Sequence, residues 1–259
     1  MKPSTYPNLE RILNINWLAN NPDHLYNQWI LKSDSSKEKR LLSSYDKYLE
    51  RVIPLLRTTK NIQGKIRNQF VDTYNELDVG CSLIERGFDV DFEFTLIGNT
   101  TPDIFIKKDN VIVEVKTLHQ SDKVERGIKS HGVYEHNEAE RIKGVLNREL
   151  EKYAKIEIIE PLIIVVCPDI IKPPYESSDD FKTVLDYQIN KMFVLGPYHA
   201  KSNKVEYKGL YYNNEGEIIS ILSGVGRWYH GKKEMDYYPN PNARKTSQIP
   251  QGNLLDFLT

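Results

Sequence analysis

The residues TPDIFI at 101–106 and VIVEVKT at 111–117 decide the fold of this sequence. Val, Ile and Phe dominate both segments, as is typical of strands. The polar residues between them, Lys107–Asn110, include an Asp and an Asn, which tolerate turn conformations. The second segment has apolar residues on both of its faces, at Val111, Ile112, Val113 and Val115, as central strands do. We therefore expect two strands joined by a tight turn, with the second strand buried.

Two registers are open for this hairpin. A two-residue loop at 108–109 sets Asp103 directly opposite Glu114, whereas a loop at 109–110 sets it opposite Lys116. Strand side chains alternate with a period of two, so both registers keep these three charged residues on one face.

Charged side chains are unexpected in a strand that is otherwise apolar. Burying an unpaired charge costs several kcal/mol or more, so such a group is paired, neutralised or bound to a metal ion. A structural ion pair between Lys116 and either Glu114 or Asp103 would satisfy this requirement. The Pro-Asp pair at 102–103, which opens the first strand, favours a functional site instead.

Pro102-Asp103 and Glu114-Val115-Lys116 resemble the motif of the PD-(D/E)xK phosphodiesterase superfamily, the restriction-endonuclease-like nucleases. The resemblance implies that Asp103 and Glu114 hold a divalent metal ion together with the backbone carbonyl of Val115. It also implies that Lys116 helps to position or activate the attacking water. Because all of these ligands are oxygens, the expected ion is Mg²⁺, with Mn²⁺ able to substitute.

A helix is predicted from about Arg67 to Arg86, with Gly87 placed as its C-terminal cap. Its apolar stripe repeats at helical spacing, and Glu76 lies at the boundary of that stripe. In the resembled superfamily a Glu on the helix before the first core strand often completes the metal site. The resemblance therefore implies a fourth site residue, Glu76, and the alternative is an ordinary residue at the rim of the apolar face.

Three further elements complete the expected core. Alternation of apolar and acidic residues predicts a half-buried strand over Phe88–Leu96, an amphipathic helix is expected from Asn137 to Ala154, and 161–167 reads as a short buried strand. The resulting order from about 66 to 167, α-β-β-β-α-β, is that of a restriction-endonuclease-like core. The predicted fold class is thus α/β, with a central mixed sheet flanked by helices and a helical N-terminal arm.

We expect three parts in the chain. Residues 1–62 form the helical N-terminal arm, 63–170 the nuclease core, and 171–259 a C-terminal α/β extension packed on the core. In the extension, 181–194 suits a helix and 208–223 suits a hairpin.

Composition narrows the function classes. The net charge of −1 over 259 residues argues against a protein that binds nucleic acid over its whole surface. The segment 32–67 nevertheless holds ten Lys and Arg against four Asp and Glu, which suits either a solvated helix face or a track for phosphates. The longest apolar run, 162–167, is far below the roughly 20 residues that span a bilayer. With only two Cys, both in apolar segments, we expect a cytoplasmic protein with reduced thiols and no membrane partner.

Four residues are candidates for contact with nucleic acid. His119 follows the second hairpin strand, and Arg141 lies near the start of the 137–154 helix. Arg227 and Lys232 belong to a run in which aromatic and basic residues interleave, which suits stacking on bases but also occurs on ordinary surfaces.

The resemblance implies a Mg²⁺-dependent endodeoxyribonuclease, of a restriction or anti-phage defence type, with DNA as its partner and RNA left open as a substrate. A homodimer would bring two such sites to the two strands of a duplex. Two alternatives stay open: a catalytically inactive nucleic-acid-binding module on the same fold, and an α/β protein in which the Glu-Lys pair is only structural.

Overall fold

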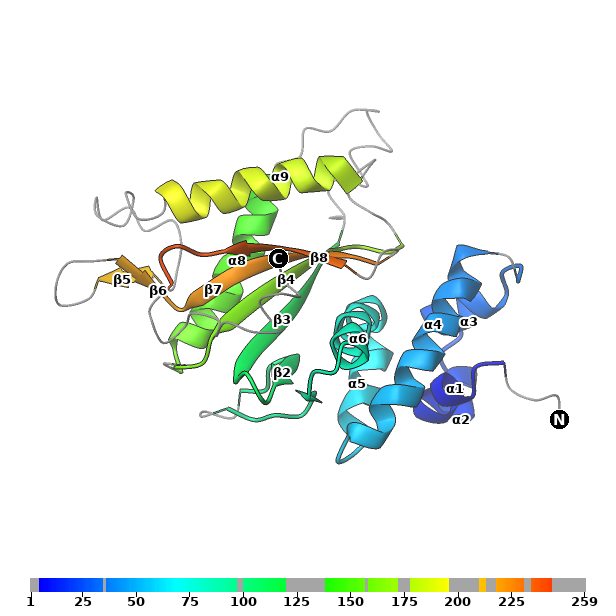
Figure 1. The fold of residues 1–259 in the computed structure, drawn as a ribbon. Helices are drawn as coiled ribbons and strands as arrows, with labels where there is room; N and C mark the ends of the chain where they lie inside the picture. The colour runs from blue at the N-terminus through cyan, green and yellow to red at the C-terminus, as the bar shows by residue number, and fades with distance from the viewer. Residues whose placement is uncertain are drawn as a thin grey trace.

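The computed structural model describes residues 5–34, 36–96, 100–119, 138–156, 158–171, 178–195, 210–212, 218–230 and 234–243. Helices fill the first third of the chain, and strands and helices share the rest (Figure 1). The helices are α1 (Pro7–Leu13), α2 (Ile15–Ala19), α3 (Leu25–Ile30), α4 (Lys37–Val52), the 3₁₀ turn η1 (Ile53–Leu55), α5 (Lys60–Asn68), α6 (Phe70–Glu85), α8 (Glu138–Ala154), α9 (Ser178–Asn190) and the π-helical η3 (Lys191–Leu195). The strands are β1 (Val90–Asp91), β2 (Ile104–Ile106), β3 (Val111–Leu118), β4 (Leu162–Pro168), β5 (Leu210–Tyr212), β6 (Ile218–Ser220), β7 (Leu222–Tyr229) and β8 (Glu234–Pro239).

The centre of the fold is a six-stranded mixed sheet in the order β1-β2-β3-β4-β7-β8. Strands β3, β4 and β7 run parallel, and β1, β2 and β8 are each antiparallel to their neighbours. Strands β5 and β6 form a separate antiparallel hairpin. The chain is therefore an α/β protein with a mixed sheet flanked by helices, as predicted.

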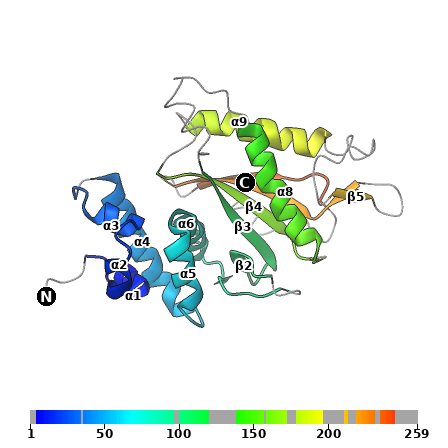
Figure 2. The same ribbon diagram turned by 180° about the vertical axis from the view of Figure 1, so that it is seen from behind.

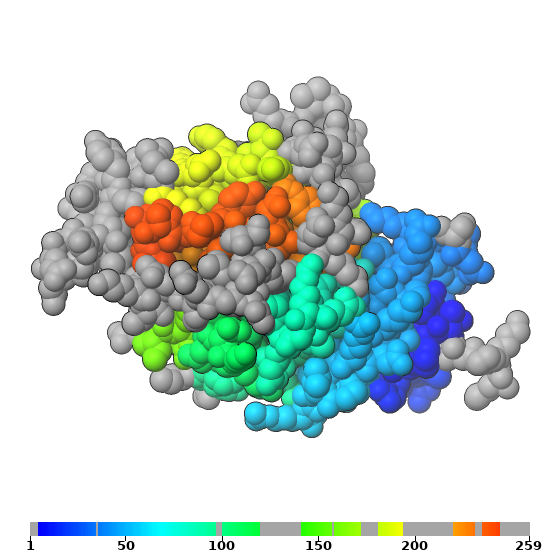
Figure 3. Space-filling view, viewed as in Figure 1, coloured from blue at the N-terminus to red at the C-terminus, as the bar shows by residue number. Residues whose placement is uncertain are grey.

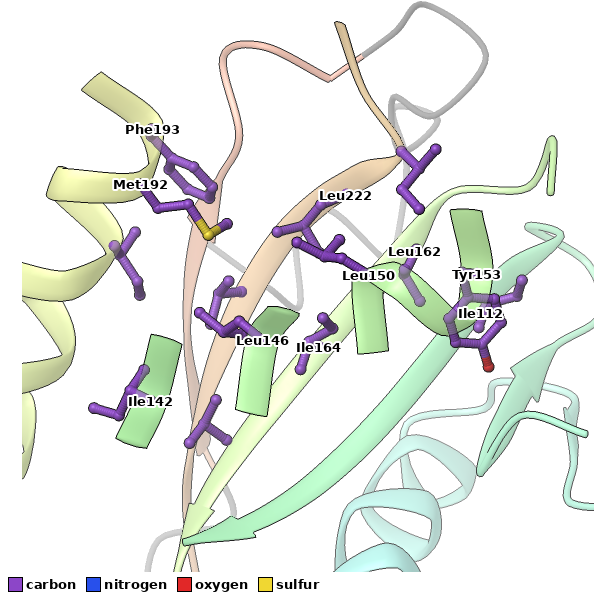
Figure 4. Close-up of a cluster of buried hydrophobic side chains, with 14 of the residues drawn as sticks. Ile112, Ile142, Leu146, Leu150, Tyr153, Leu162, Ile164, Met192, Phe193 and Leu222 are labelled. Atoms are coloured by element: carbon purple, nitrogen blue, oxygen red, sulfur yellow. The ribbon is translucent and has the colours of Figure 1, made fainter. Parts of the chain in front are cut away.

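Helices cover both faces of the sheet (Figures 1 and 2). Alternation along β3 divides the core, because Ile112 packs with α8 and α9 whereas Val113 packs with α6. Figure 4 shows the layer between α8, α9 and the sheet, in which Tyr153 lies beside Ile112. Glu114 and Lys116 share the parity of Ile112, so both lie on the face that α8 covers.

The N-terminal helices form a third core against the outer side of α6. Tyr45 of α4 packs against Phe70 and Tyr74 of α6, with ring centroids 4.9 and 5.5 Å apart. Figure 3 shows these helices gathered at one end of the molecule. Because α6 lies between this layer and the sheet, nearly all of its residues are buried.

The two expected boundaries between parts of the chain, at 62–63 and 170–171, fall inside continuous structural units. Helix α5 runs through 62–63, and β7 and β8, from the segment after 170, extend the sheet of the core. Among the described residues, no helix has the length and apolar character needed to cross a membrane.

The hairpin has the first of the two registers. Ile106 pairs with Val111 and Ile104 with Val113, which sets Asp103 opposite Glu114. Asn110 takes a positive φ of 56° in the turn, and its N–H donates to the Lys107 carbonyl at 3.3 Å. The order α6-β1-β2-β3-α8-β4 is also as predicted.

The strand expected over Phe88–Leu96 is wrong for most of its length, since β1 contains Val90 and Asp91 alone. The Asp91 side chain accepts a hydrogen bond from the Glu93 N–H at 2.8 Å, and the chain bends at 92–93, where the strand has ended. Phe94 then stacks on Phe105, with ring centroids 3.8 Å apart and planes 6° from parallel. Aromatic packing and a local turn therefore take the place of strand pairing.

Candidate active site

The three charged residues of the hairpin meet at one ammonium group. Lys116 Nζ lies 3.0 Å from Asp103 Oδ2 and 2.6 Å from Glu114 Oε2. The Val115 N–H also donates to Asp103 Oδ2 at 3.0 Å. Glu114 is fully buried, so its charge depends on these close partners.

Glu76 joins the same cluster through a lysine from α5. Glu76 is 6% exposed, and its Oε2 lies 2.6 Å from Lys65 Nζ. Lys65 Nζ also lies 3.3 Å from Asp103 Oδ1. The structure thus brings Glu76, from the helix on one face of the sheet, to the charged residues on the other.

Helix α8 adds three further side chains. Lys152 Nζ lies 2.8 Å from Glu114 Oε1, and the Tyr153 hydroxyl donates to the same oxygen. Glu149 Oε2 lies 3.6 Å from Lys116 Nζ and 3.8 Å from Lys152 Nζ. Spacings of three and four residues place these side chains on one face of the helix, which is the face over β3.

Burial and charge set different protonation tendencies within the cluster. Burial, followed by the charge of Asp103, raises the pKa of Glu76 to about 8 and that of Glu114 to about 7. Burial also opposes the charge on Asp103, but Lys116 and Lys65 outweigh it and hold that pKa below its usual range. The cluster therefore holds one firmly ionised carboxylate beside two that gain or lose a proton near neutral pH.

One buried carboxylate oxygen of the cluster faces an ammonium group. Glu114 Oε2 is buried and lies 2.6 Å from Lys116 Nζ, so an ionic contact holds it. Glu149 Oε2 is also buried, without a hydrogen bond within the described ranges. Both are hard oxygen donors of the kind that bind Mg²⁺. In the part of the chain that the structure describes, no group of three His, Cys, Asp or Glu side chains is arranged so that it could hold a metal ion without rearrangement.

Comparison of the chain with protein-family models, with curated proteins and with solved structures found no match.

The His119 imidazole lies between two carboxylates and contacts both. Its Nδ1 lies 2.7 Å from Asp169 Oδ2, and its Nε2 lies 2.8 Å from Asp72 Oδ1. The hydrogen bonds to Asp169 and Asp72 raise the pKa of His119 to about 10. The imidazole is therefore charged at neutral pH and links the end of β3 to α6 and to the residue after β4.

Replacing His119 by Ala is expected to destabilise the fold at pH 6 and to matter little above pH 10. The folded-state pKa is raised, so the stabilisation is complete below about 6.5, the usual pKa of His, and is lost as the pH rises through about 10. The side chain is 48% exposed, so solvent screening limits the effect to about 1 kcal/mol. Urea unfolding of wild type and variant at both pH values measures this, and an equal difference at the two would contradict it.

Of the other predicted nucleic-acid contacts, Arg141 and Arg227 lie in different environments. Arg141 lines a surface pocket at the start of α8. Arg227 is 1% exposed, forms an ion pair with Asp236 and stacks over the Tyr229 ring at 4.1 Å, so its guanidinium is not on the surface. Lys232 lies outside the described residues.

The sequence patterns do not predict four site residues of this cluster: Lys65, Glu149, Lys152 and Tyr153. Lys65 was counted only as part of the basic segment 32–67, and Tyr153 fits the apolar stripe of its helix. The available signal is the spacing of a Glu, a Lys and a Tyr on one helix face, which indicates a polar patch inside that stripe.

Proposed function

We propose that this protein is a metal-dependent nuclease that hydrolyses phosphodiester bonds in DNA, as an endonuclease of a restriction or anti-phage defence type. The observation that carries the proposal is the meeting of Asp103, Glu114 and Lys116 at a largely buried point between adjacent strands, with Glu76 joined to them. Ordinary surface ion pairs contribute little and do not gather three carboxylates in a protein interior.

The arrangement of the core also supports this proposal. A helix, an antiparallel three-strand unit, a second helix and a parallel strand follow one another from α6 to β4. We propose that this unit is a restriction-endonuclease-like core, to which β7 and β8 add two strands.

Hydrolysis of a phosphodiester requires stabilisation of the charge on the phosphoryl oxygens and a nucleophile made from water. A divalent ion held by Asp103, Glu114 and Glu76, with the Val115 carbonyl, would act as a Lewis acid and lower the pKa of bound water. The ligand set is all oxygen, which suits Mg²⁺ or Mn²⁺.

The lysines and the tyrosine have distinct roles in this proposal. Lys116, with its ammonium between two carboxylates, orients the attacking water and offsets charge in the transition state. Lys152 and Tyr153 fix one oxygen of Glu114, so its other oxygen stays turned toward Asp103 and Lys116. Lys65 holds Glu76 against Asp103.

The first test is cleavage of supercoiled plasmid, linear duplex, single-stranded DNA and RNA with Mg²⁺, with Mn²⁺ and with a chelator. We expect cutting of DNA that needs the metal ion and stops on chelation. Asp103→Ala is expected to lose both cleavage and calorimetric Mg²⁺ binding, because it removes a ligand. Asp109→Ala, in the turn of the same hairpin, is the matched control and is expected to retain both. Metal binding unchanged in Asp103→Ala would contradict the assignment.

A second candidate function is an inactive nucleic-acid-binding module on the same fold. It is favoured by Lys116 and Lys65, each of which bridges two carboxylates and neutralises the cluster without a metal ion. Oligonucleotide binding that is indifferent to Mg²⁺, with no cutting of any substrate, would select this function.

A further inference from the structure

A surface pocket of about 450 Å³ lies where β3 ends beside α8. Leu118 and Val145 give it an apolar floor, and Arg141 and Arg148 line it from α8. Pockets of this size hold small organic ligands, with apolar walls for the body and a few polar groups for orientation. The combination suits a ligand with a flat apolar part and negative charge at its ends.

The pocket lies next to the candidate active site along β3 and α8. Leu118 follows Lys116 by two residues and faces the same side of the sheet, about 7 Å further along the strand. On α8, Val145 precedes Glu149 by one turn, and Arg148 precedes Lys152 by one turn. A polymer bound at the active site therefore passes the pocket within a nucleotide or two.

Gly144 keeps one side of the pocket open. A Cβ added to this residue would have no heavy atom within 4 Å, and Gly144 itself lines the pocket. A glycine inside a helix is destabilising relative to alanine. Packing does not require a glycine at this position, and the absence of a side chain leaves the pocket wall open.

We propose that this pocket holds one unpaired nucleotide of the substrate strand, with its base against Leu118 and Val145 and its flanking phosphates near Arg141 and Arg148. The two arginines are seven residues apart on the helix, about 10 Å, so they suit two phosphates better than one. A paired base cannot enter such a pocket without leaving the duplex. The inference rests on the proposed function and narrows its substrate to single-stranded or locally unpaired DNA.

The pocket is tested by filling it. In the presence of a chelator, which prevents cutting, fluorescence anisotropy measures binding of a labelled single-stranded oligonucleotide and of the same sequence as a duplex. We expect the wild type to prefer the single strand, and Gly144→Leu to weaken that binding roughly 10-fold, because the added side chain would take the place of the base against Leu118 and Val145. Gly64→Leu, which adds the same side chain at an equally open glycine of α5 outside the pocket, is the matched control and is expected to bind as the wild type does.

A second variant tests the phosphate contact. Arg148→Ala is expected to reduce the slope of log affinity against log salt by about 0.7, the value for one phosphate contact on a single strand. Arg11→Ala, at an exposed position of α1 remote in sequence from the pocket, is expected to leave that slope unchanged. This arm stays decisive if Gly144→Leu does not fold.

Three outcomes would overturn the pocket: a folded Gly144→Leu with wild-type affinity, an unchanged salt slope in Arg148→Ala, or competition by a free deoxynucleoside monophosphate as effective as the oligonucleotide. The last would assign the pocket to free nucleotides. Weakened binding in Gly144→Leu without any cleavage by the wild type would reject the nuclease and keep the pocket. Metal-dependent cleavage with unaltered binding in Gly144→Leu would reject the nucleotide pocket and keep the nuclease.

Discussion

Lys116→Ala is expected to lower the rate of DNA cleavage by about 10²–10³-fold while Mg²⁺ still binds, since removal of one preorganised charge-stabilising group costs that much. The Lys116 ammonium lies within 3.0 Å of both Asp103 and Glu114, so it is fixed where charge would develop. Steady-state kinetics and calorimetry on the same preparation measure the two effects. The cleavage rate should fall, and the affinity for Mg²⁺ should be retained.

The same variant has an expected effect on stability that needs no substrate. Without Lys116, Asp103 and Glu114 lose their shared cation, and removal of one partner of a buried ion pair costs about 3–5 kcal/mol. Mg²⁺ would restore that compensation, so it should raise the melting temperature of Lys116→Ala more than that of the wild type. A thermal melt with and without Mg²⁺ measures this difference.

Lys107→Ala is the matched control for Lys116→Ala. Lys107 belongs to the same hairpin, and its partner Asp89 is 66% exposed. Exposed pairs contribute about 0–1 kcal/mol, so cleavage and melting should both stay close to wild type. Wild-type cleavage by Lys116→Ala, or an equal loss in Lys107→Ala, would reject the role of Lys116.

Local sequence signals were sufficient for the hairpin and for α6. The turn residues at 107–110 limited the register to two choices, and both choices kept Asp103, Glu114 and Lys116 on one face. Helical spacing then put Glu76 at the edge of an apolar stripe. These features depend on neighbours in sequence, which is why periodicity could identify them.

The rest of the cluster depends on packing between distant segments. Lys65 reaches Asp103 only because α5 lies against α6, and Lys152 reaches Glu114 only because α8 crosses the face of β3. Similarly, the alternating pattern at 88–96 predicted a strand, but Phe94 stacks on Phe105 and does not extend the sheet edge. Periodicity carries no information about such contacts.

Asp78→Ala is expected to cause a large loss of stability although Asp78 lies outside the candidate site. Asp78 is fully buried on α6 and accepts hydrogen bonds from Tyr48 at 2.5 Å, Trp228 Nε1 at 2.7 Å and His230 Nδ1 at 2.8 Å. A buried donor without an acceptor costs about 1–3 kcal/mol, so losing the acceptor of three should cost about 4 kcal/mol or more. Urea unfolding followed by circular dichroism gives the free energy of unfolding.

The partners of Asp78 make this prediction specific. Tyr48 lies on α4 of the N-terminal helices, whereas Trp228 and His230 lie on β7 and directly after it. One carboxylate thus joins segments 180 residues apart in sequence to the helix between them. If the network acts as a unit, Asp78→Ala combined with Trp228→Phe should cost less than the two single losses added together. Asp89→Ala, which removes an exposed carboxylate, should cost no more than about 1 kcal/mol. Strict additivity, or a cost for Asp78→Ala as small as that of Asp89→Ala, would show that hydrophobic packing alone holds the N-terminal helices and β7 to α6.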